Sequence, residues 1–239
     1  MKKFSINVAG QRVDGTFFVP NNENKNPGVI FFHGAGSSEK RYIGMAEQLI
    51  NNGIAVMAFS MRGHGGTSEG TSSSIVTQDN ILDAMAIYDF FVKQKGVDKE
   101  KIGICGTSYG AVVGTALLEK YNIKSIALRV PAVYTDQMMK TNLDAILADE
   151  KHIFNALSEI ENTSVIKAIK KFSGSLLVIV SENDRLIPLA IPETIIKEAN
   201  LVKRKELKIM KNASHALVNP KQGQEFTDII TEWFKETLI

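Results

Sequence analysis

A serine between two glycines is the residue whose surroundings point most directly to chemistry. The pentapeptide Gly106–Thr107–Ser108–Tyr109–Gly110 has the pattern G-x-S-x-G, and it lies between the apolar run Ile102–Cys105 and the helical pattern Ala111–Lys120. A serine on a sharp strand-to-helix turn is held in a strained backbone conformation with its hydroxyl exposed, and the flanking glycines let the two backbones approach each other. We therefore predict that Ser108 is a nucleophile.

An aspartate and a histidine follow later strand-like runs, in an order that suits the activation of this serine. Asp184 comes after Leu176–Val180, and His215 comes after the next predicted strand. A histidine can take the proton of a serine hydroxyl, and a carboxylate on the other ring nitrogen fixes the tautomer and stabilises the imidazolium. We predict His215 as the general base and Asp184 as the acid that orients it. Asp136, which follows the predicted strand Ser125–Val130, is the alternative acid.

A glycine-rich loop after the first long apolar run predicts an oxyanion hole. His33–Gly34–Ala35–Gly36 follows Gly28–Phe32 and has the H-G-x-G pattern. In such a loop, the backbone N–H after His–Gly and the N–H after the nucleophile both point at the developing oxyanion. These donors are expected to be Ala35 and Tyr109. His33 lies in the wrong loop to be the base.

The elements that position these residues are predicted from hydrophobic runs and helical periods. Short continuous apolar runs indicate strands that are buried on both faces: Gly28–Phe32, Ala55–Phe59, Ile102–Cys105, Ser125–Val130 and Leu176–Val180. A further, strand-like run is Lys205–Met210. Helical patterns lie between or after them: Glu39–Asn51, Thr77–Gln94, Ala111–Lys120, Pro192–Ala199 and Gln222–Leu238. This alternation predicts an α/β fold, a mostly parallel sheet with helices on both faces and the ligand site at the carboxyl ends of the strands.

Two segments depart from the alternation. At the start of the chain, Lys3–Val8 and Gly15–Val19 are expected to form an antiparallel hairpin with its turn at Asp14–Gly15. Later, Ala132–Phe172 has two or three helix-like stretches where one crossover would suffice. We expect this insertion to lie over the strand ends as a cap, with some of its apolar residues lining the pocket. These residues are Val133, Tyr134, Met138, Met139, Leu143, Ile146, Leu147, Ile153, Phe154 and Leu157.

Composition places the chain among ordinary globular proteins. It has 239 residues, 44% of them hydrophobic and 23% charged, and no linker-like segment, so a single domain over residues 1–239 is expected. A net charge of +2 without a basic patch argues against nucleic acid, and no apolar stretch is long enough for a membrane span.

Cys105 is the single cysteine, which agrees with a cytoplasmic location. No metal or cofactor motif is present, so no cofactor is expected. Nothing in the sequence indicates the oligomeric state.

Taken together, these motifs resemble the α/β-hydrolase superfamily, in particular its small serine esterases, such as bacterial cinnamoyl and feruloyl esterases, and related serine peptidase catalytic domains. The loop Arg62–Gly63–His64–Gly65 is similar to an R-G-H-G loop common there, and we expect Arg62 and His64 to have a structural role. The resemblance implies an esterase acting on a small-molecule ester with a short to medium or aromatic acyl group. A peptidase or acyltransferase with the same triad is the first alternative. A binding protein that has lost catalysis is the second.

Overall fold

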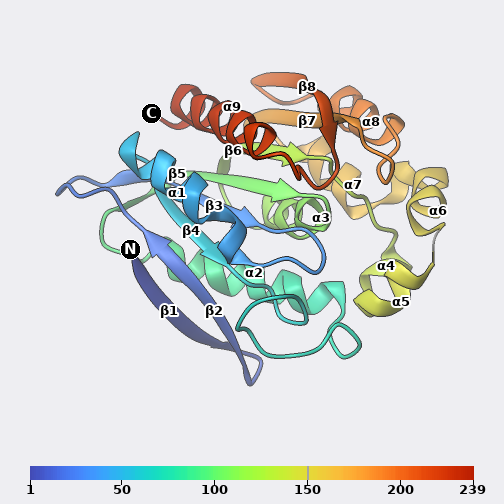
Figure 1. Cartoon of the computed structure of the whole chain (residues 1–239), viewed down its shortest axis with the longest axis horizontal. Coiled ribbons are helices and arrows are strands. Elements are labelled where there is room, and N and C mark those ends of the chain that lie inside the picture. Colours follow the sequence, from blue (N-terminus) through green and yellow to red (C-terminus); the bar gives the residue numbers. More distant parts are fainter. Residues whose placement is uncertain (150) are drawn as a thin grey trace.

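The computed structural model describes residues 1–149 and 151–239 of the chain. Within these residues, one sheet has the strand order β1-β2-β4-β3-β5-β6-β7-β8 (Figure 1). The strands are β1 Lys2–Val8, β2 Gln11–Phe18, β3 Asn26–Phe32, β4 Ala55–Phe59, β5 Val97–Thr107, β6 Ile123–Arg129, β7 Ser175–Asn183 and β8 Arg204–Ser214. β2 is antiparallel to β1 and β4, whereas the strands from β4 to β8 are parallel. The predicted mostly parallel sheet is confirmed.

Helices cover both faces of the sheet. The α-helices that pack on it are α1 Ile43–Asn51, α2 Thr77–Phe91, α3 Tyr109–Thr115, α7 Ser164–Lys171, α8 Ala190–Glu198 and α9 Pro220–Leu238. The side chains of α1 and α9 share one core with Phe31, while those of α2, α3, α7 and α8 share the other with Ile30 and Phe32. Adjacent residues of β3 therefore enter opposite cores, which explains why the central strands are continuously apolar.

The opening hairpin forms, but the predicted position of its turn is wrong. The chain reverses at Ala9 and Gly10, whose φ angles are 51° and 84°. Such a two-residue turn with positive φ matches the twist of the flanking strands. Asp14 and Gly15 instead lie within β2, where Gly15 pairs with Phe4. A Cβ on Gly15 would lie 2.5 Å from Cζ of Phe4, so this glycine serves packing rather than a turn.

The segment between β6 and β7 divides into two parts. Its first helices are α4 Asp136–Met139, α5 Leu143–Ala148 and α6 His152–Ser158, and they lie at one end of the molecule (Figure 1). The last helix, α7, buries Val165 and Ile169 and packs against α3 and α8 as a layer on the sheet. Only the part before α7 therefore remains available as a cap. One residue of the predicted insertion, Glu150, lies outside the described residues.

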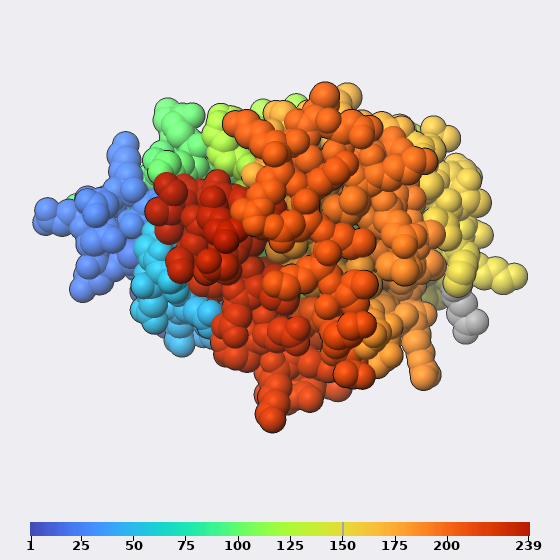
Figure 2. Space-filling view, turned by 90° about the horizontal axis from the view of Figure 1, so that it is seen from above, coloured from blue at the N-terminus to red at the C-terminus, as the bar shows by residue number. Residues whose placement is uncertain are grey.

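Short 3₁₀ helices complete the chain: η1 Glu39–Tyr42, η2 Ala116–Glu119 and η3 Ile160–Asn162. Seen from above, the orange and red C-terminal part of the chain covers the middle of one face, between the blue N-terminal region and the yellow segment that contains α5 and α6 (Figure 2). Of the helices that the structure describes, none combines the length and apolar character that a membrane crossing requires.

Candidate active site

Ser108 occupies the sharp turn between β5 and α3 in a strained conformation. Its backbone angles are φ 52° and ψ −117°, a region that residues other than glycine seldom adopt. The turn is possible because the neighbouring glycines have no side chain. A Cβ on Gly110 would lie 2.1 Å from the carbonyl oxygen of Phe32, and one on Gly106 would lie 2.8 Å from the carbonyl oxygen of Gly110. The backbone around the serine is thus held by steric packing.

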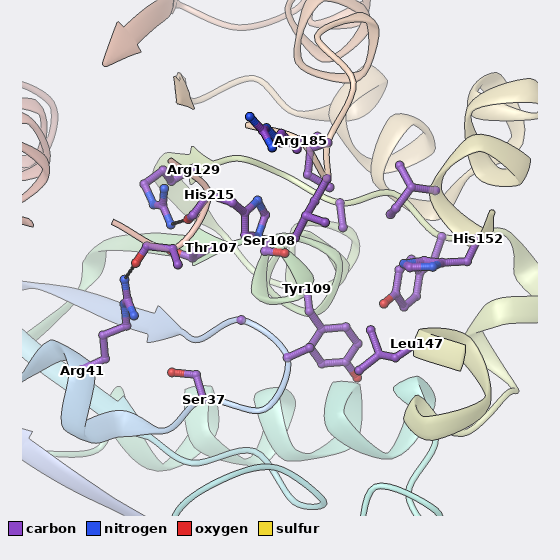
Figure 3. Close-up of a pocket in the computed structure, with 18 of the residues that line it drawn as sticks. Ser37, Arg41, Thr107, Ser108, Tyr109, Arg129, Leu147, His152, Arg185 and His215 are labelled. Carbon is purple, nitrogen blue, oxygen red and sulfur yellow. Dashed lines mark hydrogen bonds between the residues drawn. The ribbon is translucent and has the colours of Figure 1, made fainter. Parts of the chain in front are cut away.

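Asp184 and His215 meet although 31 positions separate them. The Nδ1 atom of His215 lies 2.8 Å from Oδ2 of Asp184, and the aspartate side chain is only 4% exposed. The backbone N–H groups of Leu186 and Ile187 donate to Oδ1 at 2.8 and 3.0 Å. Because Nδ1 faces the carboxylate, Nε2 is the ring nitrogen left for chemistry. Figure 3 shows the imidazole beside Ser108.

Asp184 is ionised at neutral pH. Burial raises the pKa of its carboxyl group, but the hydrogen bond from His215 and those from the N–H groups of Ile187 and Leu186 lower the pKa by more. The net effect is a pKa below the ordinary aspartate value. The carboxylate can therefore hold the imidazole in one orientation and stabilise its protonated form.

Asp136, the alternative acid, lies away from this pair. It stands in the first turn of α4 with its side chain 76% exposed, and Oδ2 lies 3.6 Å from Nζ of Lys167. An exposed pair of this kind contributes little. The structure thus brings Asp184, and not Asp136, to His215.

The two expected oxyanion donors stand on neighbouring elements. Ala35 lies in the loop after β3, and Tyr109 is the first residue of α3. Both line the same cavity as Ser108 and His215. Neither backbone N–H donates to another group of residues 1–149 or 151–239, so both remain available to a ligand.

A partly buried hydrogen-bond network links the loop that carries Ala35 to the side chain of Tyr109, and Asn80 is its centre. The Nδ1 atom of His64 accepts from the backbone N–H of Gly36 at 3.1 Å, and Nε2 lies 3.1 Å from Oδ1 of Asn80. The Tyr109 hydroxyl donates to the same Oδ1 at 2.7 Å. Burial lowers the pKa of His64 to about 4, despite the hydrogen bond with Asn80, so the ring is neutral with its proton on Nε2. The network therefore restrains the two elements that carry the expected oxyanion donors.

Sequence reasoning did not identify Asn80. A signal was present, because Asn80 and Asp83 are polar residues three positions apart on the face of α2 that buries Ala84 and Ile87. Asp83 forms a buried ion pair with Arg62 at 2.7 Å, and Asn80 donates from Nδ2 to the carbonyl oxygen of Arg62. Polar side chains on a buried face need partners, which is why they hold this loop. Arg62 and His64 have the structural contacts that the sequence led us to expect.

His33 is enclosed in the protein. Its Nε2 accepts from the backbone N–H of Met61 at 2.9 Å, and its Nδ1 donates to the carbonyl oxygen of Gly34 at 2.8 Å. Burial, and to a lesser degree the neighbouring His64, lower the pKa of His33 to about 3. It is a neutral structural side chain, as the position of its loop suggested.

Two arginines that sequence reasoning missed hold the histidine loop. Arg129, at the end of β6, donates from Nη2 to the carbonyl oxygen of His215 at 2.7 Å. Arg41 donates to the next carbonyl, that of Ala216. The loop that carries His215 is thus fixed from two sides.

Five parallel strands contribute to this site at their carboxyl ends, where the fold predicts a ligand. Ala35 follows β3, Ser108 follows β5, Arg129 ends β6, Asp184 follows β7 and His215 follows β8. The site is therefore assembled from residues that are distant in the sequence and adjacent in the sheet.

The cavity over Ser108 has a volume of about 560 Å³, a size typical of small-molecule sites. Tyr134, Leu147, Ile153 and Phe154 form an apolar wall on the side of α5 and α6. The other apolar residues predicted as candidates do not line the cavity: Val133, Met138, Met139, Leu143, Ile146 and Leu157. Several of them, including Met139, are buried in the core instead, so the methionines do not shape the pocket.

The sheet order, the strained serine and the aspartate–histidine pair together define an α/β-hydrolase. The chain belongs to the serine aminopeptidase S33 family, whose model matches residues 23–157, more than half of its length. It is 23% identical to an uncharacterised protein of Mycobacterium tuberculosis over 230 residues, which cover 96% of this chain and 77% of that protein. The chain is thus a hydrolase of the α/β-hydrolase type.

Solved esterases have the same fold. Est1E from Butyrivibrio proteoclasticus, determined with bound ferulic acid, superposes with a TM-score of 0.72 at 18% identity, covering 98% of this chain and 96% of that one. An esterase from Exiguobacterium antarcticum gives a TM-score of 0.70 at 14% identity, covering 97% and 98%. At these identities the likeness establishes the fold, and the substrate has to be argued from the site itself.

Proposed function

We propose that the protein is a serine hydrolase that cleaves carboxylic esters through an acyl-enzyme intermediate. The observation that carries the proposal is the position of Ser108. It stands in a strained strand-to-helix turn, in the same cavity as the imidazole that Asp184 orients. A serine hydroxyl, a histidine within its reach and a buried carboxylate behind the histidine are the parts that acyl transfer requires.

The proposed reaction has two halves. Oγ of Ser108 attacks the ester carbonyl carbon while Nε2 of His215 takes its proton, and the N–H groups of Ala35 and Tyr109 donate to the oxyanion. The intermediate collapses when the histidine returns the proton to the leaving alcohol. Water, activated by the same nitrogen, then attacks the acyl group and releases the acid. Oγ forms no hydrogen bond with the imidazole within the described part of the chain, and such contacts often tighten only when substrate binds.

An ester is favoured over an aminopeptidase substrate by the charges around the cavity. A substrate with a free amino terminus presents an ammonium group, which a carboxylate would recognise. Among the described residues that line the cavity, there is no aspartate or glutamate. The peptidase remains the second candidate because the family takes its description from serine aminopeptidases. An acyltransferase would transfer the acyl group to an acceptor other than water. A non-catalytic binding protein would show no turnover.

The experiment is activity-based labelling followed by a comparison of substrates. A fluorophosphonate should label the wild-type protein at Ser108 and leave Ser108→Ala unlabelled. Ser108→Ala should lower kcat on p-nitrophenyl butyrate by about 10³-fold to 10⁶-fold while circular dichroism stays unchanged. Faster cleavage of aminoacyl p-nitroanilides than of p-nitrophenyl esters would favour the peptidase. Absence of labelling would favour the binding protein.

A further inference from the structure

The arginines of this chain divide into two groups according to their ion pairs. Three lie outside the cavity, and each has a carboxylate within 4 Å: Arg12 with Asp14, Arg62 with Asp83, and Arg204 with Glu206 and Glu236. The other three line the cavity: Arg41, Arg129 and Arg185. Within residues 1–149 and 151–239, none of these three forms an ion pair. The arginines without a carboxylate partner among the described residues are thus the ones that line the cavity.

Arg129 is the most informative of the three because it is only 2% exposed. Its Nη1 and Nη2 atoms donate to neutral oxygens, the Ser181 hydroxyl at 3.1 Å and the His215 carbonyl at 2.7 Å. Its Nε has no partner among the described residues. A buried cation without a counter-charge is unfavourable, and the nearby Asp184 carboxylate already accepts from His215 and two backbone N–H groups.

Two of the three arginines are placed at one end of the pocket. In Figure 3, Arg41 and Arg129 lie on one side, together with Thr107. Leu147 and His152 lie on the opposite side, and Ser108 and His215 stand between the two groups. Arg185 is exposed on the loop that follows Asp184 and also lines the cavity, and in the view of Figure 3 it lies above Ser108 and His215. One end of the pocket is therefore cationic and the other apolar, with the nucleophile in the middle.

These guanidinium groups have N–H donors to spare. A guanidinium has five, in a geometry that suits a carboxylate. The structure records two hydrogen bonds from Arg129, one from Arg41 and none from Arg185 to described residues. Burial lowers the pKa of Arg129 to about 10, so the group stays charged at neutral pH.

We propose that the pocket selects esters that carry a carboxylate group away from the scissile bond, such as half-esters of dicarboxylic acids or acyl esters of hydroxy acids. The cationic end binds the carboxylate, and the apolar wall takes the hydrocarbon part. The inference rests on the proposed esterase function. In the reaction, water adds across the bond between the acyl carbon and the ester oxygen, giving an acid and an alcohol. The distal carboxylate is unchanged.

Two matched pairs of substrates test the proposal. For a charge on the acyl side, 4-nitrophenyl hydrogen adipate is compared with 4-nitrophenyl adipamate, its neutral amide. For a charge on the alcohol side, 3-(butyryloxy)benzoate is compared with 3-(butyryloxy)benzamide. We expect kcat/KM to favour the anion by about tenfold or more in at least one pair, as a charge-assisted hydrogen bond would produce. Ratios at or below unity in both pairs would overturn the inference.

Variants separate a binding role of the arginines from a purely structural one. If Arg41 and Arg185 bind the carboxylate, the double variant Arg41→Gln/Arg185→Gln should bring the ratio of anionic to neutral kcat/KM close to unity. If they only hold the loop, both rates should fall together and the ratio should persist, which would contradict the proposal. Arg129→Gln should act in the same direction, and the two more exposed arginines keep the test valid if that variant does not fold. Arg12→Gln is the control and should keep the wild-type ratio of anionic to neutral kcat/KM.

A binding measurement distinguishes failure of this inference from failure of the esterase function. By calorimetry, Ser108→Ala should bind the anionic member of the favoured pair about tenfold more tightly than the neutral one. Preferential binding with no turnover in the wild type would support the anion site and overturn the esterase. Turnover of neutral esters without any preference would leave the esterase standing and overturn the anion site.

Discussion

The states of the side chains in and around the candidate site are set by their immediate surroundings. Asp184 is nearly enclosed, yet three hydrogen bonds keep it ionised. His33 is buried and His64 is partly buried; both are neutral, and they hold loops. His215 differs from them because one of its ring nitrogens faces the carboxylate while the ring borders the cavity. Similar residues thus have different roles because their burial and partners differ.

Replacement of the two candidate acids distinguishes them. Asp184→Asn should lower kcat/KM by up to about 10⁴-fold, because the amide no longer fixes the imidazole or stabilises its charge. Asp136→Asn is the matched control and should change the rate little, because this side chain is exposed and pairs with Lys167 rather than with His215. Initial rates on p-nitrophenyl butyrate measure both effects. A larger loss of kcat/KM in Asp136→Asn than in Asp184→Asn would identify Asp136, in α4, as the acid.

The lowered pKa of Asp184 also predicts how its stabilising effect depends on pH. A carboxyl whose pKa is lower in the folded state contributes stability above its unfolded-state pKa of about 3.9, and this contribution is lost as the pH falls through the folded-state value. Chemical unfolding should therefore show Asp184→Asn less stable than the wild type at pH 7, with a smaller difference in acid. A difference that grows as the pH falls would contradict the lowered pKa.

At the scale of elements, the proposed oxyanion hole depends on the contacts of α2 with the His64 loop and with Tyr109. Asn80→Ala should loosen the loop held by His64 and free the Tyr109 hydroxyl. We expect kcat to fall by roughly 10-fold to 10²-fold with a smaller change in KM, because oxyanion hydrogen bonds act mainly in the transition state. Affinity for a trifluoromethyl ketone inhibitor should fall in parallel. Asn200→Ala, an exposed asparagine after α8, is the control. If Asn80→Ala lowers the stability of the protein but not its affinity for the inhibitor, Asn80 contributes only to packing.

The turn between β5 and α3 tolerates no side chain at Gly110. Gly110→Ala would place a methyl group 2.1 Å from the carbonyl oxygen of Phe32, so we expect a loss of folding stability of several kcal/mol, on the order of that for other severe steric defects. Gly223→Ala is the matched control because nothing lies within 4 Å of its Cβ position in α9. It should stabilise the protein by about 0.5–1 kcal/mol. Urea unfolding measures both, and equal midpoints would contradict the packing argument.

At the scale of the whole molecule, two cores on opposite faces of the sheet leave the strand ends free for the site. The sheet fixes the positions of the loops that carry the site residues. The short helices α4, α5 and α6 lie at one end of the molecule (Figure 1). Because α7 belongs to the layer on the sheet, the part of the insertion that shapes the pocket is small.

Because only a small part of the insertion borders the cavity, we expect small substrates. The cavity of about 560 Å³ is closed on one side by Tyr134, Leu147, Ile153 and Phe154, which suits a short, medium or single-ring aromatic acyl group. Across p-nitrophenyl esters from acetate to palmitate, with methyl ferulate alongside, kcat/KM should be highest for the short to medium or aromatic acyl groups. No jump in rate is expected above the solubility limit. If palmitate is cleaved fastest with such a jump, the pocket is that of a lipase.

Much of this could be predicted from the sequence because it depends on local patterns. Apolar runs predict the buried strands, since parallel strands are apolar on both faces. The pattern around Ser108 predicts a strained turn because only glycines allow that backbone approach. The order of Ser108, Asp184 and His215 predicts the catalytic set because each follows a strand and the strand ends share one edge.

The tertiary structure decided what depends on neighbours distant in the sequence. The position of the hairpin turn followed from strand pairing, which placed Gly15 opposite Phe4 rather than in a turn. Asn80 became part of the site because α2 packs against two loops. The sequence alone does not show which of the six arginines lie at the cavity. Which of them lack a carboxylate partner among the described residues depends on differences of a few ångströms that a sequence does not show, since the energy of an ion pair falls steeply with distance and exposure.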